Sequence, residues 1–211
     1  HPERKLSRES AALLHHSALR MLGLTADVSG FETRVARNTK AAAFFAKRRG
    51  LRVPLIPTGF DGLCWAIIGQ QINVPFAASL RREILHLAGE KVGDMRTHPT
   101  AERVANLDIK ELCKRRYSRS KADYLIGAAK EVAEKKLDIE NLPQGSALAA
   151  EKKLTAVRGI GTWTARYAML RGGFADAAPV GDSALATALQ RLHQREDRPE
   201  HEEVHEMMKA Y

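Results

Sequence analysis

The sequence contains few cysteines, and this excludes several classes of protein. Among 211 residues only Cys64 and Cys113 occur, each inside an apolar pattern of helical spacing. Two cysteines cannot form a four-cysteine zinc or iron–sulfur site, and one distant pair does not indicate a disulfide-stapled secreted domain. We therefore expect two buried thiols in a reducing compartment.

Long hydrophobic runs are also absent. The longest uncharged stretch, from Gly62 to Leu80, is interrupted by Gln, Asn and Pro, so it is neither a signal peptide nor a membrane span. We expect an intracellular protein without a membrane partner, in the cytoplasm or nucleoid of a bacterium or the nucleus of a eukaryote. Because the chain begins with His1 rather than Met and ends at Tyr211 within a helical pattern, we expect the native protein to be longer.

Signals for β-strands are nearly missing as well. Only Leu51–Ile56 is short, β-branched and bounded by Gly and Pro, whereas elsewhere apolar residues recur three and four positions apart. The sequence therefore predicts an all-α fold. The helices expected from this spacing and from capping residues cover 7–22, 31–49, 61–68, 75–88, a segment starting at 101, 109–114, a segment from 118 or 120 to 136, and 147–156. The expected caps are Thr97–Thr100 before residue 101, Asp108 before residue 109, and Ser118 or Ser120 at the start of the long helix.

We expect these helices to form two lobes. One central lobe covers residues 60–158, and the second combines both flanks, 1–59 and 159–211. A linker rich in Pro and Gly precedes the central lobe, at Pro54 and Pro57–Gly59. A cleft is expected between the lobes.

The charge balance favours an anionic partner. Lysine and arginine together number 34, against 25 aspartates and glutamates, which gives a net charge of +9 and a pI near 9.8. Since no long basic amphipathic helix stands apart from the rest, nucleic acid is favoured over a membrane surface.

A tight turn interrupts one apolar helical pattern. The stretch from Leu154 to Leu170 carries apolar residues on both sides of Gly159-Ile160-Gly161. Glycines flanking one aliphatic residue permit a sharp reversal, and Thr162 is placed to cap the second helix. Exposed N–H groups at such a helix start suit a phosphate oxygen. An ordinary αα-corner with a glycine C-cap is the alternative.

A second segment adds a carboxylate about twenty residues further on, at Val180-Gly-Asp-Ser-Ala-Leu185. The hairpin, its aromatic residues and this segment together resemble the helix–hairpin–helix DNA glycosylase superfamily, and within it the branch of DNA-3-methyladenine glycosylase II. The pattern G-I-G-x-W-T-A-x-Y of that branch reads here from Gly159 to Tyr167. The resemblance extends to Phe60–Ile72 and Tyr117–Ala122, and it covers roughly residues 55–195.

The resemblance implies a two-lobed glycosylase fold and a monofunctional DNA glycosylase of base excision repair. Such an enzyme hydrolyses the N-glycosidic bond of alkylated bases, such as 3-methyladenine, in double-stranded DNA. We expect a monomer that requires no cofactor. Two alternatives stay open: a non-catalytic helix–hairpin–helix DNA-binding module, and a glycosylase for deaminated or mismatched bases.

Asp182 is the candidate catalytic residue. Breaking an N-glycosidic bond passes through an oxocarbenium-like sugar that needs a negative charge near C1′. The catalytic aspartate of the resembling family falls on Asp182, and the alternative is a plain helix N-cap. Its spacing from Trp163 is 19 residues, one fewer than the resemblance leads us to expect. Asp176 is therefore a second candidate, although no glycine precedes it and no helical run follows it.

Position 163 distinguishes two chemistries. Bifunctional members of the superfamily carry a lysine there, whose amine attacks C1′ and forms a Schiff base. Trp163 offers no nucleophile, so we expect no abasic-site lyase activity. Trp163 and Tyr167 lie one helical turn apart and are expected to wall a pocket in which a flipped base stacks. The alternative is that both are core aromatics.

Gln71 matches the position that intercalates in the resembling family. A side chain there fills the gap that a flipped base leaves in the duplex. The alternative is a solvated glutamine in a turn.

The resemblance also implies two backbone sites at the hairpin. Amides grip a DNA phosphate, and these are expected at Gly159, Gly161 and Thr164. Carbonyls hold a structural Na+ or K+ ion, and these are expected at Thr155, Val157 and Ile160. Arg158 beside them adds salt-sensitive attraction to DNA.

Overall fold

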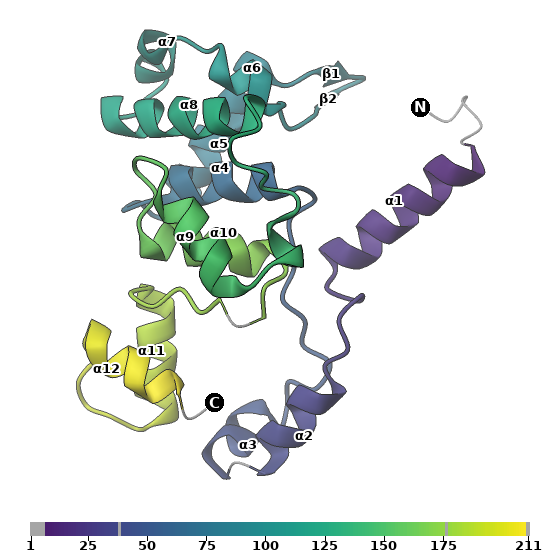
Figure 1. The fold of residues 1–211 in the computed structure, drawn as a ribbon. Helices are drawn as coiled ribbons and strands as arrows, with labels where there is room; N and C mark the ends of the chain where they lie inside the picture. The colour runs from purple at the N-terminus through teal and green to yellow at the C-terminus, as the bar shows by residue number, and fades with distance from the viewer. Residues whose placement is uncertain (1–6, 38, 176, 210–211) are drawn as a thin grey trace. The chain divides into compact units, whose positions relative to one another are not determined.

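The computed structural model describes residues 7–37, 39–175 and 177–209. The chain forms two compact units, one from residues 56–178 and the other from 7–55 together with 179–209 (Figure 1). The all-α prediction is confirmed, since within these described residues the elements are helices apart from one two-stranded sheet. The expected boundary at residue 158 lies within the first unit, because the helix after the hairpin packs against the centre of that unit.

The first unit is built around helix α4, Gly59–Gly69. Apart from Asp61 this helix consists of apolar residues and glycines, and it packs against α5, α8 and α10, so that Leu63, Ile67 and Ile68 have no exposed surface. The other elements of this unit are α5 Val74–Ala88, β1 Lys91–Val92, β2 Met95–Arg96, α6 Ala101–Ala105, α7 Ile109–Lys114, α8 Arg119–Ala133, the 3-10 helix Leu142–Gln144, α9 Ala147–Thr155 and α10 Thr162–Gly172.

Three helices of this unit begin at the capping residues expected from the sequence. The side chains of Thr100, Asp108 and Ser118 each accept a hydrogen bond from a backbone N–H in the first turn of α6, α7 and α8, respectively. Helix α8 ends at Ala133 rather than at residue 136, and Lys135 adopts a left-handed φ of 58° just beyond it.

The second unit contains α1 Arg8–Met21, α2 Ser29–Arg37, α3 Thr39–Phe45, α11 Ser183–Leu192 and α12 His201–Met208. Its buried cluster is small and consists of Val180, Ala186, Leu189 and Val204. The single helix expected over 31–49 is assigned as α2 and α3 instead, and residue 38 between them lies outside the described residues.

Two local details differ from what the sequence indicates. Residues 51–56, which carry the strand-like signal, form no strand, whereas β1 and β2 pair antiparallel, with Val92 opposite Met95. Gly93, at a φ of 59°, starts the two-residue turn, so Gly93-Asp94 was the signal that sequence reasoning missed. Cys64 is buried as expected, but Cys113 is exposed. In the ranges that the structure describes, none of the helices is long and apolar enough to cross a membrane.

Candidate functional site

The hairpin joins α9 to α10 as the sequence predicted. Gly159 has a φ of 85° and so needs glycine's freedom, whereas Gly161 has an extended backbone with a φ of −83°. The expected cap by Thr162 was wrong, because Gly161 occupies the N-cap position and Thr162 is already the first helical residue. The first helical hydrogen bond runs from Ala165 N to Gly161 O at 2.9 Å, so the N–H groups of residues 162–164 precede it.

The two glycines have different surroundings. A Cβ atom on Gly159 would lie 2.1 Å from Cγ of Tyr124, so this glycine permits close packing of the hairpin on α8. A Cβ atom on Gly161 would meet nothing within 4 Å. The turn is therefore open beside Gly161 and the start of α10, where a phosphate oxygen is expected to bind.

Thr164 lies in the first turn of α10, and its side chain is buried. Its hydroxyl oxygen accepts a hydrogen bond of 2.9 Å from the side-chain amide of Gln70, which also donates to the carbonyl of Gly159 at 2.9 Å. The side chain of Thr164 thus anchors the hairpin within the protein, and the expected contact of its backbone amide with a phosphate stays a prediction. Sequence reasoning did not single out Gln70.

Arg158 is the exposed cation of the hairpin. Its side chain is 82% exposed, forms an ion pair of 3.0 Å with Asp123 and lies 5.9 Å from the ring centroid of Tyr124. Beside it is a cavity of about 310 Å³ lined by Ile109, Arg119, Ser120, Asp123 and Arg158. Because exposed ion pairs contribute little, Asp123 does not prevent Arg158 from exchanging this partner for another anion.

The two aromatic residues of α10 are brought together. The rings of Trp163 and Tyr167 stack with centroids 5.2 Å apart and planes inclined by 24°, and both residues are half-buried. Offset stacking holds both rings in one orientation and leaves part of their surface open. The two rings are therefore exposed enough for another planar group to stack on them.

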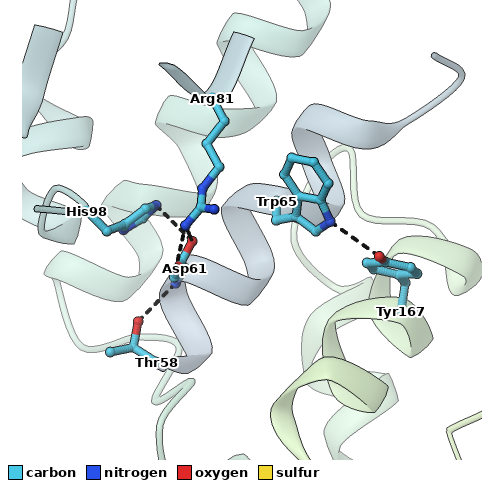
Figure 2. A network of polar contacts seen from close by, with 6 residues as sticks. All are labelled: Thr58, Asp61, Trp65, Arg81, His98 and Tyr167. Atoms are coloured by element: carbon cyan, nitrogen blue, oxygen red, sulfur yellow. Dashed lines mark hydrogen bonds and ion pairs between the residues drawn. The ribbon is translucent and has the colours of Figure 1, made fainter. Parts of the chain in front are cut away.

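A third aromatic residue, which sequence reasoning missed, extends this pair. Nε1 of Trp65 donates a hydrogen bond of 3.2 Å to the hydroxyl of Tyr167, and the Arg81 guanidinium lies 5.9 Å from the Trp65 ring centroid (Figure 2). The signal was present, because Trp65 lies within Phe60–Ile72, the first segment of the family resemblance.

Arg81 is itself fixed by a buried carboxylate. Nη2 of Arg81 lies 2.8 Å from both oxygens of Asp61, and Nε2 of His98 lies 3.2 Å from one of them (Figure 2). Asp61 is 3% exposed, so its charge is compensated by these contacts rather than by water. Burial lowers the pKa of His98, although the charge of Asp61 opposes this shift. No local pattern in the sequence indicates this network.

Asp182 begins α11 as its N-cap. One carboxylate oxygen accepts hydrogen bonds from the backbone N–H groups of Ala184, at 2.8 Å, and Leu185, at 3.2 Å. Gly181 before it has a φ of 93°, and a Cβ atom there would lie 3.0 Å from Cδ2 of His201. Asp182 therefore caps the helix, and its two hydrogen bonds hold the half-buried carboxylate in one orientation. The second candidate, Asp176, lies outside the described residues.

Gln71 lies in the turn between α4 and α5. It is exposed and has a left-handed φ of 57°, which is uncommon for a residue other than glycine. The exposed position is compatible both with an intercalating side chain and with a solvated turn residue.

The proposed cation ligands are backbone carbonyls of the hairpin. The carbonyl of Val157 accepts the N–H of Ile160 at 3.1 Å, and a carbonyl oxygen has a second lone pair for another partner. Neutral oxygens in a tight turn suit a hard monovalent cation, and such an ion at Thr155, Val157 and Ile160 stays a prediction. In the part of the chain that the structure describes, no cluster of three or more His, Cys, Asp or Glu side chains is placed to hold a metal ion.

Two helices, α9 and α10, joined by a glycine hairpin define a helix–hairpin–helix protein. The chain belongs to the HhH-GPD superfamily of base excision DNA repair proteins, whose family model matches residues 64–211.

Several relatives are similar to this chain. A DNA-3-methyladenine glycosylase of Bacillus subtilis is 35% identical over 75% of this chain and 54% of its own length. DNA-3-methyladenine glycosylase 2 of Escherichia coli is 35% identical over 60% of this chain and 45% of its own length. The chain thus spans about half the length of these curated relatives. A 3-methyladenine DNA glycosylase from Archaeoglobus fulgidus shares the fold, with a TM-score of 0.84 and 24% identity over 97% of this chain and 70% of that one.

Proposed function

We propose that this protein is a monofunctional DNA glycosylase that releases alkylated bases such as 3-methyladenine from double-stranded DNA. The observation that carries the proposal is the helix after the hairpin. Its first-turn N–H groups precede the first helical hydrogen bond, beside the open position at Gly161, which suits a phosphate. The stacked, half-buried rings of Trp163 and Tyr167 suit the wall of a pocket for a flipped base. The names of the similar relatives support alkylated bases as the substrate class.

In the proposed reaction Asp182 stabilises the positive charge that develops on the sugar. The C1′–N bond breaks, its electron pair leaves with the base, and a water oxygen attacks C1′ while its proton passes to solvent. A base that is already cationic through alkylation leaves readily, so one carboxylate suffices. The products are a free base and an abasic site in an intact strand.

DNA binding in this proposal is divided between several groups. The amides of Gly159, Gly161 and Thr164 bind one phosphate, and Arg158 adds attraction that does not depend on sequence. Gln71 fills the gap left by the flipped base. A Na+ or K+ ion on the carbonyls of Thr155, Val157 and Ile160 would supply positive charge between the hairpin and the phosphate. The protein acts as a monomer and needs no other cofactor.

The test is a base-release assay on duplexes that carry a single lesion each. We expect free 3-methyladenine from methylated DNA, detected by chromatography, and far slower release from duplexes with hypoxanthine, uracil or a mismatch. Preferential release of a deaminated or mismatched base would favour the second glycosylase function. Binding without release of any base would favour a non-catalytic DNA-binding module.

A further inference from the structure

A buried lysine caps the C-terminal end of α4. Lys121, on α8, is 8% exposed, and its ammonium group donates to three backbone carbonyls. The acceptors are Ile67 O at 3.1 Å, Ile68 O at 2.8 Å and Gln70 O at 3.0 Å. The last carbonyls of a helix have no partner within it, and an ammonium has three donors, so Lys121 uses its full capacity on this turn.

Burial lowers the pKa of Lys121 to about 8. The amine is therefore mostly protonated at neutral pH and can supply all three donors. A neutral residue of similar length would leave three carbonyls without these partners.

Gln70 forms hydrogen bonds through both its backbone carbonyl and its side-chain amide. Its backbone carbonyl accepts from Lys121, and its side-chain amide donates to the Gly159 carbonyl and the Thr164 hydroxyl, both at 2.9 Å. A continuous path of hydrogen bonds therefore runs from α8 through the end of α4 to the hairpin, three segments that are distant in sequence.

The same path reaches Gln71. The Gln70 carbonyl belongs to the peptide group that links it to Gln71, and Gln71 has the left-handed φ of 57°. A residue other than glycine keeps such a backbone only where its surroundings fix it. The contact from Lys121 fixes the peptide plane just before this residue.

We propose that Lys121 is a positioning residue that sets the spacing between the Gln71 turn and the phosphate-binding hairpin, so that one duplex engages both while a base is flipped. This rests on the proposed function, in which Gln71 fills the gap and the hairpin binds phosphate. Lys121 acts through Gln70 and does not itself touch DNA.

The test separates this role from that of a simple helix cap. Lys121→Met removes the ammonium donors and keeps a side chain of similar length. Gln70→Met leaves the hydrogen bonds from Lys121 to the three backbone carbonyls in place and removes only the side-chain hydrogen bonds from Gln70 to the hairpin. Lys130→Met, at an exposed position of the same helix, is the matched control. Flipping is measured by 2-aminopurine fluorescence beside the lesion, affinity with an undamaged duplex, and stability by thermal unfolding.

We expect Lys121→Met and Gln70→Met to reduce the flipping signal about tenfold, because each loses hydrogen bonds that define the turn, while affinity for undamaged DNA changes much less. The double variant should lose little more than either single variant, since both interrupt one path. Lys121→Arg should restore part of the signal. Lys130→Met should match the unmodified protein.

Normal flipping by Gln70→Met would overturn the inference even if Lys121→Met failed to fold, because the link from Gln70 to the hairpin would then be dispensable. Normal flipping by both variants with reduced stability would leave Lys121 as a helix cap, and the proposed function would stand. Absence of flipping by the unmodified protein would overturn both.

Discussion

Trp65 and Tyr167, 102 residues apart in sequence, share a hydrogen bond of 3.2 Å from the indole nitrogen to the phenol oxygen. Tyr167 also stacks on Trp163, so its ring is fixed from two directions. In the proposed enzyme this bond orients the wall of the base pocket.

Trp65→Phe keeps an aromatic ring and removes the donor. We expect release of 3-methyladenine to slow by about two- to tenfold, which corresponds to the usual net contribution of one hydrogen bond, while DNA affinity stays unchanged. Single-turnover rates measure this. In a Tyr167→Phe background the substitution of Trp65 should have little further effect, and a full additional loss would show that Trp65 acts through another contact.

Asp182→Asn should nearly abolish base release. Loss of the charge opposite an oxocarbenium raises the barrier by about 3–5 kcal/mol, which slows the reaction several-hundred-fold or more. Asparagine is an equally good N-cap, so folding and DNA affinity should stay near those of the unmodified protein. Turnover close to normal in this variant, together with an inactive Asp176→Asn, would move the catalytic role to Asp176.

The two hairpin glycines should respond differently to substitution. At Gly161 the backbone is extended and a Cβ meets nothing, so Gly161→Val should fold normally but bind every duplex about tenfold more weakly, because the side chain blocks approach to the phosphate. At Gly159, Ala requires a left-handed backbone and collides with Tyr124, so stability should fall by more than about 1 kcal/mol. Unchanged affinity of Gly161→Val for DNA would show that the hairpin amides do not bind a phosphate.

Borohydride should trap no covalent adduct between the protein and damaged DNA. A Schiff base needs an uncharged amine at C1′, and position 163 holds a tryptophan. Lys152 and Lys153 are exposed on α9, before the turn, and Lys121 donates to three carbonyls. Strands should remain intact until heat or base cleaves the abasic site, as a denaturing gel would show. Efficient trapping would contradict the monofunctional proposal.

Acid should destabilise the protein partly through His98. Burial lowers the pKa of His98, so below its usual value of about 6.5 the unfolded chain takes up a proton that the folded chain does not. Stability therefore falls as the pH falls through this interval. The loss of melting temperature between pH 7 and pH 5 should be smaller in His98→Gln, whereas the exposed His86→Gln should behave like the unmodified protein.

The sequence by itself determined the features that depend on neighbours along the chain. Helix starts at Thr100, Asp108 and Ser118 follow from side chains that bond amides two or three residues ahead, and the hairpin follows from a glycine that permits a positive φ. The cap expected at Thr162 and the strand-like signal at Leu51–Ile56 are local too, and they differ from the structure because a few residues are compatible with more than one local conformation.

Only the tertiary structure decided which distant side chains meet. The bonds of Lys121 to the end of α4, of Gln70 to the hairpin, and of Trp65 to Tyr167 arise because α8 and α10 both pack against α4. The contacts among Asp61, Arg81 and His98 likewise join side chains that are far apart in sequence. A periodic pattern shows which face of a helix is buried but not which helix covers it. The hydrophobic effect depends on the apolar area removed from water and does not select the partner that covers it.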